Sequence, residues 1–250
     1  MSDIVARAFA LIDLLANSEK PLRLMEIVEK TGFDKSTAHR ILRSLTARDF
    51  LARDPDTLRY RIGPAFMTIA AGALSRFDLC VVARPYLSRL VDLTSETVSL
   101  HLRVGHHRVC LDGVESQHEV RSIQPTGERR PLHRGITGKV ILAYLREQDA
   151  AVVFQLAQSE GDNLEELDTE LKHIRDLGGF WGISDRLPDV GVLSVPIFMA
   201  NEIAGSLTVS GPCQRCTGEQ LEGYFPQVQE VAKKISAELG SDRRCWPSTV

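Results

Sequence analysis

The segment of residues 31–45, TGFDKSTAHRILRSL, places hydroxyl, imidazole and guanidinium groups along one side of a candidate helix. At about 100° per residue, its apolar positions fall on the other side, at Ala38, Ile41, Leu42 and Leu45. Hydroxyls and backbone amides at a helix N-terminus suit phosphate oxygens, and arginine can contact guanine edges or phosphates. The pattern predicts DNA contacts from Lys35, Ser36, Thr37, His39, Arg40 and Arg43, with an ordinary solvated helix face as the alternative.

Two earlier segments supply the elements that would hold this helix. Apolar residues recur at helical spacing over residues 3–16, and a second short helix is predicted over residues 24–30. Gly32 is expected to end that second helix, and Asp34 or Ser36 is expected near the N-cap of the third. The short turn between the last two helices is typical of a helix-turn-helix.

The segment of residues 50–63, FLARDPDTLRYRIG, has strand-forming residues on both sides of a turn at Asp54-Pro55-Asp56. In the return strand Arg59 and Arg61 alternate with apolar residues, so both guanidiniums would share the face directed away from the helices. A hairpin behind a helix-turn-helix forms a wing, which contacts phosphates or a minor groove. We therefore predict a winged helix-turn-helix DNA-binding domain over residues 1–63.

A linker helix is predicted over residues 64–78, because Pro64 suits the first turn of a helix. Apolar residues then recur at helical spacing, at Phe66, Ile69, Ala70, Ala73 and Leu74. This stripe can pack on its own domain or pair with the same helix of a second copy. A homodimer would also suit DNA, because a single winged domain makes few contacts for high specificity.

The rest of the chain is predicted to form an α+β domain over residues 79–240, followed by a C-terminal tail at residues 241–250. Strands are expected over residues 96–104, 108–114, 119–124, 180–185, 190–198 and 203–210. Helices are expected over residues 81–93, 137–145, 149–157, 164–177 and 217–239. Antiparallel strands with helices on one or both faces are typical of a sensor-like domain.

Catalytic and metal-binding motifs are weak in this larger domain. Residues 135–139 fall short of the phosphate-loop spacing. Cys213 and Cys216 form one CxxC without a second ligand pair, which favours ordinary thiols over zinc. We therefore expect no enzyme, no metal and no cofactor. Two alternatives stay open: an enzymatic or metal-binding domain carried by a DNA-binding head, and an architectural DNA-binding protein without a ligand.

The composition is that of a soluble globular protein: of 250 residues, 43% are hydrophobic and 25% are charged. No apolar run reaches the ~18 residues of a membrane span, and the N-terminus lacks the pattern of a signal peptide. Five cysteines without a secretion signal indicate a cytoplasmic location. The net charge of −3 hides a basic segment, residues 31–61, with 7 Lys and Arg against 4 Asp and Glu.

Four motifs in order resemble the IclR family of bacterial transcriptional regulators: KSTAHRILRSL, RDPDTLRYRIGP, RPLHRGITGKVILAYL, and SVPIF followed by GSLTVSGP. The resemblance runs from about Ile4 to Ile235, and its specificity lies in the ordered set. It implies an N-terminal winged helix, a linker helix and a C-terminal GAF-like effector domain. It also implies homodimers or homotetramers that repress or activate at palindromic promoter sites, in response to small metabolites such as organic or aromatic acids.

The same resemblance implies an effector cavity lined by Gly135, Ile136, Thr137, Ser184, Asp185, Val192, Ser194, Thr208 and Ser210. Hydroxyls and backbone N–H groups at a helix N-terminus suit a small anion, and Arg121 and Arg134 are candidate partners for its carboxylate. Arg186-Leu187 replaces an acidic pair that the family often has after the Ser-Asp position, and the turn at residues 199–202 is shorter than usual. The effector, the promoter and the sign of regulation stay open.

Overall fold

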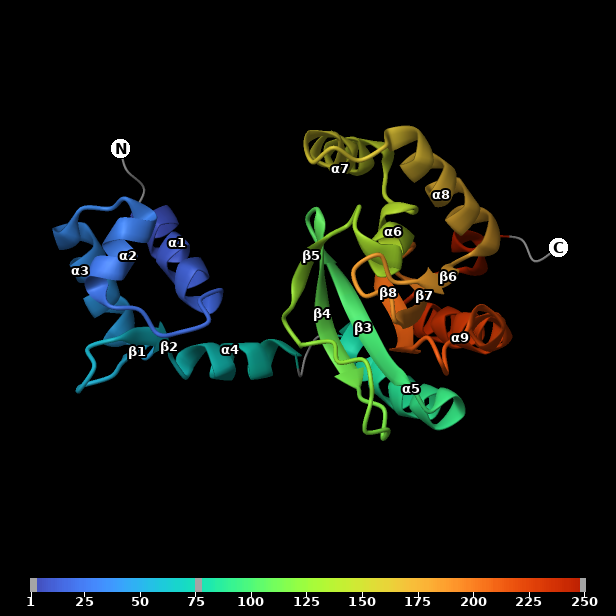
Figure 1. Cartoon of the computed structure of the whole chain (residues 1–250), viewed down its shortest axis with the longest axis horizontal. Coiled ribbons are helices and arrows are strands. Elements are labelled where there is room, and N and C mark those ends of the chain that lie inside the picture. The colour runs from blue at the N-terminus through green and yellow to red at the C-terminus, as the bar shows by residue number, and fades with distance from the viewer. Residues whose placement is uncertain (1–3, 75–77, 248–250) are drawn as a thin grey trace. The chain divides into compact units, whose positions relative to one another are not determined.

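The computed structural model describes residues 4–74 and 78–247 and divides into two compact units, residues 1–76 and 77–250 (Figure 1). Each unit has its own hydrophobic core and is described by itself. The predicted linker helix is α4 (Ala65–Leu74), and α5 begins at Asp78; residues 75–77 of the predicted linker lie outside the described residues. The domain boundaries expected from the sequence stay predictions.

The N-terminal unit begins with α1 (Ile4–Ala16), α2 (Leu24–Thr31) and α3 (Lys35–Thr46). Leu11, Ile27 and Leu42 are fully buried in the core that these helices share. Gly32 ends α2 in the left-handed conformation, at a φ of 68°, which glycine adopts without a steric penalty. Asp34 then caps α3 by accepting a hydrogen bond from the N–H of Thr37 at 2.8 Å. The predicted helix-turn-helix is confirmed at these positions.

The predicted wing is an antiparallel pair of strands, β1 (Leu51–Arg53) and β2 (Tyr60–Ile62). Its turn is held by Asp54, whose carboxylate accepts hydrogen bonds from the N–H groups of Asp56 at 3.1 Å and Thr57 at 2.7 Å. Tyr60 exchanges backbone hydrogen bonds with Leu22, which lies between α1 and α2. The wing is therefore joined to the helical core and does not project as an independent ribbon.

The linker helix α4 is covered on one side near its start. The ring of Phe66 packs edge-on against that of Phe50, with 5.1 Å between the centroids. Met67 and Ile69 are 74% and 55% exposed within this chain. Of the expected apolar stripe, Phe66 is thus partly covered and Ile69 is exposed, and the side chains of Ala73 and Leu74 lie outside the described residues.

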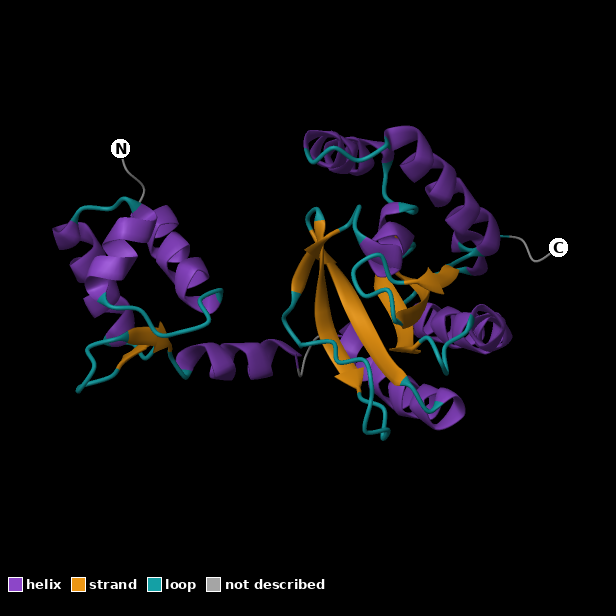
Figure 2. Cartoon of the chain, viewed as in Figure 1, coloured by secondary structure: helices purple, strands orange, loops and turns teal. Residues whose placement is uncertain are grey.

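The C-terminal unit is an α+β domain, as expected (Figure 2). Its helices are α5 (Asp78–Thr94), α6 (Gly135–Leu142), α7 (Glu147–Ser159), α8 (Leu164–Leu177) and α9 (Gly218–Glu238). Its strands are β3 (Thr97–Val104), β4 (His107–Val114), β5 (Arg129–Pro131), β6 (Phe180–Ile183), β7 (Val190–Met199) and β8 (Glu202–Pro212). In the described residues the strands form one antiparallel sheet in the order β5-β4-β3-β8-β7-β6.

The two faces of this sheet differ in chemistry, because successive side chains of a strand point to opposite faces. Apolar residues of the central strands form one face and pack with α5 and α9 into the main core: Val98, Leu100, Leu193, Val195, Ile197, Leu207 and Val209. Polar residues form the other face: Thr97, Ser99, His101, Ser194, Ser206, Thr208 and Ser210. These polar side chains are also buried, and α6 packs on their part of β7 and β8.

The strand expected over residues 119–124 is wrong, since that segment is a loop and the edge strand β5 lies at residues 129–131. Two apolar side chains of the loop, Val120 and Ile123, are 70% and 54% exposed, so this segment has no buried apolar face. The loop is instead held by side chains, because the carbonyl of Ser122 accepts from the hydroxyl of Thr97 at 2.6 Å. The edge of the sheet is then filled after the turn at Gly127.

The segment expected as a C-terminal tail packs on the C-terminal unit up to residue 247, where the description ends. A short 3₁₀ helix covers Arg243–Cys245. Trp246 is 8% exposed, and its ring lies edge-on to that of Phe198, with 5.4 Å between the centroids. Trp246 therefore belongs to the main core, and Cys245 packs against it.

A buried carboxylate of this unit, Glu96 at 2% exposed, pairs with Arg215. The guanidinium of Arg215 also donates to the carbonyl of Val120 at 2.9 Å. We predict that Arg215→Met lowers the free energy of unfolding by about 3 kcal/mol, because a buried carboxylate loses its partner. Urea denaturation followed by circular dichroism measures this loss. Lys172→Met, which removes an exposed pair with Asp168, should change it by less than ~0.5 kcal/mol.

A double variant tests the reason for this loss. In the Arg215→Met background, Glu96→Gln removes the unpaired charge and should restore part of the stability. Equal stabilities of the single and double variants would show that the buried charge is not the cause.

Candidate functional site

The polar side of α3 is exposed, as the sequence pattern indicated. Its members, here called the α3 flank, are Lys35, Ser36, Thr37, His39, Arg40 and Arg43. All are exposed except the half-buried Thr37, whereas Ala38, Ile41 and Leu42 on the opposite side are buried. The hydroxyl of Ser36 donates to the Asp34 carboxylate at 2.6 Å, and this bond and that from Thr37 lower the pKa of Asp34. Asp34 therefore stays charged and orders the first turn of α3.

A further arginine extends the α3 flank. Arg40, Arg43 and Arg48 line a shallow surface depression together with Ser44 and Ala47. Arg48 donates from Nη1 to the hydroxyl of Ser44 at 3.0 Å. The spacing of four residues from Arg40 to Ser44 and on to Arg48 was available in the sequence. Our sequence reasoning ended at Leu45 and missed Arg48.

The two wing arginines, expected on one DNA-facing strand face, have different surroundings. Arg59 donates from Nη1 to the carbonyl of Pro21 at 2.7 Å and to the carboxylate of Glu26 at 3.1 Å. Arg59 thus ties β2 to the start of α2. Arg61 is exposed on the same strand. Of these two predicted arginines, Arg61 is therefore the one whose side chain is open to solvent; Arg53, at the end of β1, is exposed as well.

A cavity of about 290 Å³, here called the α6 cavity, lies on the polar side of the large sheet at the start of α6. Its lining combines residues of β4, β5, β7 and β8 with the loop after β6. Eight predicted effector residues line it: Arg134, Gly135, Ile136, Thr137, Ser184, Asp185, Val192 and Thr208. The remaining lining residues were not predicted: Arg108, Gln124, Arg130, Arg186, Leu187 and Val190.

The start of α6 is joined to the loop after β6. The Asp185 carboxylate accepts a hydrogen bond from the N–H of Gly135 at 2.8 Å. Gly135 has a φ of 74°, and a Cβ there would lie 3.4 Å from the Asp185 carboxylate. The hydroxyl of Ser184 accepts from the N–H groups of Arg186 and Leu187 at 3.3 and 3.2 Å. These bonds shape the mouth of the α6 cavity, and they place an anion at the positive end of the helix.

Hydroxyl groups line the floor of the α6 cavity in a connected set. The Thr208 hydroxyl lies 3.0 Å from that of Ser194 and 3.4 Å from that of Thr137. Ser194 lies behind Thr208 and outside the lining. Ser210 is also outside it, because its hydroxyl bonds that of Ser122 at 3.1 Å. The predicted hydroxyls thus separate into lining residues and residues that support them.

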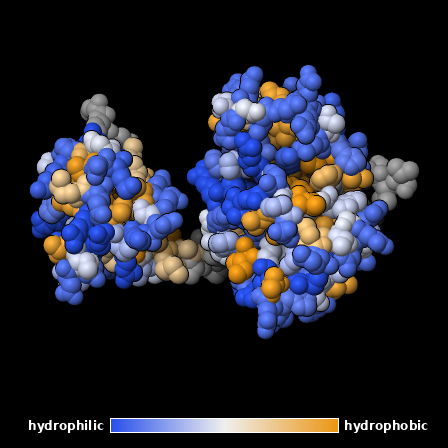
Figure 3. Space-filling model, in the orientation of Figure 1, coloured by the Kyte–Doolittle hydropathy of each residue, from blue (hydrophilic) through white to orange (hydrophobic). Residues whose placement is uncertain are grey.

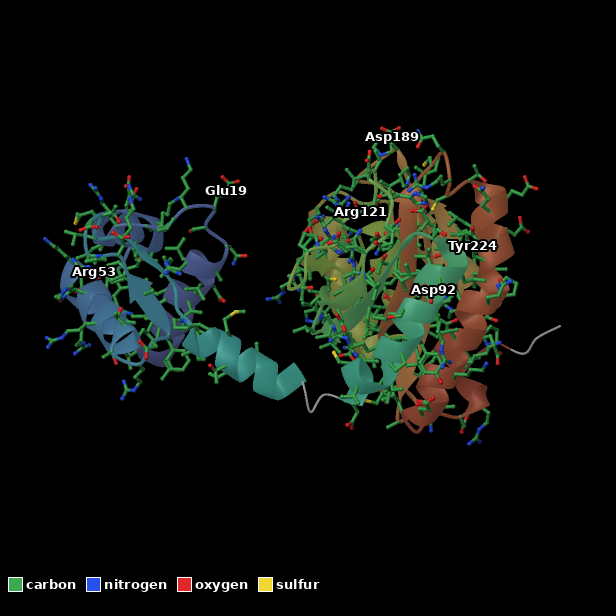
Figure 4. The ribbon with its side chains drawn as sticks, turned by 90° about the horizontal axis from the view of Figure 1, so that it is seen from below. Glu19, Arg53, Asp92, Arg121, Asp189 and Tyr224 are labelled. Atoms are coloured by element: carbon green, nitrogen blue, oxygen red, sulfur yellow. The ribbon has the colours of Figure 1, made fainter. Side chains whose placement is uncertain are left out.

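One of the two arginines expected in the effector cavity lines the α6 cavity. Arg134 lines the α6 cavity, and its guanidinium also pairs with Asp162 at 2.9 Å. Arg121, labelled in Figure 4, does not line the cavity. It pairs instead with Glu115 at 2.7 Å and donates to the carbonyl of His118. Its assignment to the effector is therefore corrected: the loop that we expected to be a strand directs this side chain elsewhere.

Arg108 and Arg130 are the cavity arginines that sequence reasoning missed. They are direct partners in the β4–β5 register, so their side chains share one face. Arg108 is 8% exposed and donates from Nη1 to Nδ1 of His101 at 3.0 Å. Arg108 and Arg130 are 22 residues apart in the chain, and their pairing has no local signal because β5 is only three residues long.

Across residues 4–74 and 78–247, no group of three or more His, Cys, Asp or Glu side chains is placed to hold a metal ion. The Cys213 thiol is half-buried, 3.6 Å from the carbonyl of Pro188, and Cys216 is buried. In the same described ranges, none of the helices combines the length and apolar character that a membrane crossing requires.

The comparisons with known proteins agree with this arrangement. The family description "Bacterial transcriptional regulator IclR C-terminal" matches residues 71–237, and "IclR helix-turn-helix domain" matches residues 4–55. The HTH-type transcriptional regulator BhcR of Paracoccus denitrificans is 31% identical over 237 residues, covering 92% of this chain and 85% of BhcR. The HTH-type transcriptional repressor AllR of Escherichia coli K12 is 27% identical over 241 residues, covering 94% and 89%.

A solved structure extends the likeness to the fold. The IclR transcriptional regulator from Alicyclobacillus acidocaldarius superimposes with a TM-score of 0.84 at 26% identity, covering 96% of this chain and 100% of the other. A helix-turn-helix unit followed by an α/β unit with an antiparallel sheet is thus the architecture of a two-domain transcriptional regulator. The chain belongs to the IclR family. It is an IclR-type regulator with an N-terminal DNA-binding domain and a C-terminal ligand-binding domain.

The thiols of the CxxC differ in their surroundings, and their reactivity should differ accordingly. Burial raises the pKa of Cys216 to about 12 and that of Cys110 to about 11. Because the thiolate is the reactive form, iodoacetamide at pH 8 should modify Cys213 faster than Cys216, by a factor on the order of 100. Peptide mass spectrometry over time measures both rates. The two rates should become similar in urea, where both thiols are exposed. Equal rates in the folded protein would show that burial does not slow the modification of Cys216.

Proposed function

We propose that the α3 flank binds the major groove of promoter DNA. The observation that carries this proposal is the exposed, cationic side of a helix whose other side is fixed in the core. Ser36 and Thr37 would contact phosphates at the helix N-terminus. His39, Arg40 and Arg43 would reach base edges or phosphates.

We further propose that the wing takes part through Arg61, which would contact a phosphate or the adjacent minor groove. Arg59 is better suited to positioning the wing, since it already bonds Pro21 and Glu26. Two winged domains would then engage the two halves of a palindromic site. A homodimer or homotetramer supplies them, and the exposed Met67 and Ile69 of α4 support pairing with a second copy.

We propose that the α6 cavity binds a small organic acid as effector. Its support is a set of hydroxyls and arginines around a cavity of about 290 Å³ at a helix N-terminus. Binding would shift the relative positions of the winged domains and thereby change their fit to two half-sites. The cavity would bind the effector without catalysing a reaction on it, as a transcriptional regulator does. A protein that acts on promoter DNA works in the bacterial cytoplasm.

Replacing Arg40 tests the DNA-binding proposal. Arg40→Ala should weaken binding to a promoter fragment by about 1–3 kcal/mol, because an arginine contact to a base edge or phosphate is lost. Fluorescence anisotropy at two salt concentrations measures the effect. Lys172→Ala, which removes one positive charge from α8, is the matched control and should bind as the unaltered protein does. Undiminished promoter binding by Arg40→Ala would remove this residue from the interface.

Replacing Thr208 tests the effector proposal. Thr208→Val keeps the shape of the side chain but removes the hydroxyl at the floor of the α6 cavity. The affinity for an acid that alters promoter binding should fall about tenfold, from the loss of one hydrogen bond. Promoter affinity without the acid should stay nearly constant. Titration of promoter complexes with the acid measures both, and an unchanged dose response would exclude Thr208 from the ligand site.

A further inference from the structure

The charges around the α6 cavity are unevenly balanced. At the α6 end, Arg134 is paired with Asp162 at 2.9 Å and with Glu160 at 3.4 Å. The carboxylate of Asp185 is also engaged there, as the acceptor of the Gly135 N–H. This end of the cavity thus carries three carboxylates and one arginine.

Where β4 and β5 form the wall, positive charges outnumber negative charges. Arg108, Arg130 and Arg186 line the cavity there. Glu128 is the carboxylate that lies within electrostatic reach of all three guanidiniums, and it bonds Arg130. Three positive charges therefore face one negative charge at this wall, whereas the carboxylates of Glu160, Asp162 and Asp185 lie at the α6 end. Figure 3 shows strongly hydrophilic residues over this part of the C-terminal unit.

Arg108 and Arg130 would repel each other in an empty cavity. Like charges at directly opposite positions of two strands destabilise a sheet, and these arginines are register partners. Burial, followed by repulsion from Arg130, lowers the pKa of Arg108 to about 10, so Arg108 remains charged at neutral pH. The Nε atoms of both side chains are buried and have no hydrogen-bond partner among the described residues. A buried cation with an unused hydrogen-bond donor is stabilised by an anion that accepts the bond.

The orientation of Arg108 is set from behind by His101. Guanidinium groups only donate hydrogen bonds, so Nδ1 of His101 must accept the bond from Arg108 at 3.0 Å. Burial and the charge of Arg108 hold the pKa of His101 well below its usual value, which keeps the ring neutral. Its proton therefore lies on Nε2 and is donated to the hydroxyl of Ser99 at 2.9 Å. The hydrogen bonds from Arg108 to His101 and from His101 to Ser99 therefore hold the guanidinium of Arg108 in position for a carboxylate.

We propose that the α6 cavity takes a small dicarboxylate rather than a monocarboxylate, with one carboxylate held by Arg108 and Arg130 and the second balanced by Arg186. This inference rests on the proposed effector function and names the class of its ligand. Two separate carboxylates suit arginines that come from two elements, the β4–β5 pair and the loop after β6. A phosphate would be expected at a helix N-terminus, but Asp185 already occupies that position on α6.

Matched acids test this proposal on the full-length protein. Malonate, succinate, glutarate, adipate and phthalate are compared with propanoate, butanoate, pentanoate, hexanoate and benzoate, at constant ionic strength and pH 7.5. Calorimetric titration gives the affinities, and inorganic phosphate is included as a further probe. We expect one or more dicarboxylates to bind at least about tenfold more tightly than the matched monocarboxylate, because charge-assisted bonds to a second carboxylate are added.

Variants then locate the preference. Arg186→Met removes the charge that balances the second carboxylate and should reduce the preference for the dicarboxylate to about twofold or less, whereas Arg108→Met and Arg130→Met should each weaken the binding of both matched acids. Arg108→Met leaves His101 without its donor, so Arg130→Met serves as the second variant, in which that contact is kept. Arg84→Met is the matched control, because Arg84 is an exposed arginine of α5 outside the cavity lining. It should keep the full preference, and circular dichroism verifies that each variant is folded.

Several outcomes would overturn the inference while leaving the proposed function standing. These are equal affinities for matched acids, a full preference that survives Arg186→Met, and a phosphate that binds more tightly than every dicarboxylate. If no acid of either set binds, the inference and the small-acid effector both fall. DNA binding by the α3 flank is tested separately by Arg40→Ala.

Discussion

The structure of the C-terminal unit depends on the need of every buried polar group for a partner. Strand alternation places Leu193, Leu207 and Val209 on the apolar face of the sheet, while hydroxyls fill the other face although it too is buried. The helices α5 and α9 cover the apolar face. The polar face requires hydrogen bonds, and α6 and the loops above it supply them, as in the contact between the hydroxyls of Thr208 and Thr137. A cavity with polar walls is the consequence of covering such a face incompletely.

The same requirement explains why charge collects in the α6 cavity. A buried guanidinium is stable only with hydrogen bonds and a counterion nearby. Arg134 has Asp162, and Arg130 has Glu128. Arg108 has a neutral imidazole as its partner, which orients the guanidinium but does not neutralise it. Binding of an anion would complete the electrostatics of the sheet, and stability gained in this way is a means by which a ligand can shift the population of a regulator.

In the N-terminal unit the polar groups of the α3 flank are exposed, as the proposed contact with DNA requires. The α3 flank can be exposed since Ile41 and Leu42 anchor the other side of the helix in the core. Arg59 illustrates the limit of this design. Although it alternates with apolar residues as Arg61 does, its side chain turns back to Glu26 and supports the wing.

Strong local periodicity was enough to predict the helix-turn-helix, the wing, most helices of the C-terminal unit and the β7–β8 hairpin. Four motifs in order were enough to predict the family, and with it the segments around Gly135, Asp185 and Thr208. The remaining features came from contacts between distant parts of the folded chain. The tertiary structure placed β5 instead of residues 119–124 at the sheet edge, turned Arg121 away from the cavity and set Arg108 opposite Arg130. The reason is physical: spacing along the chain decides which side chains share a face, whereas the partner across a strand or loop depends on contacts between distant residues.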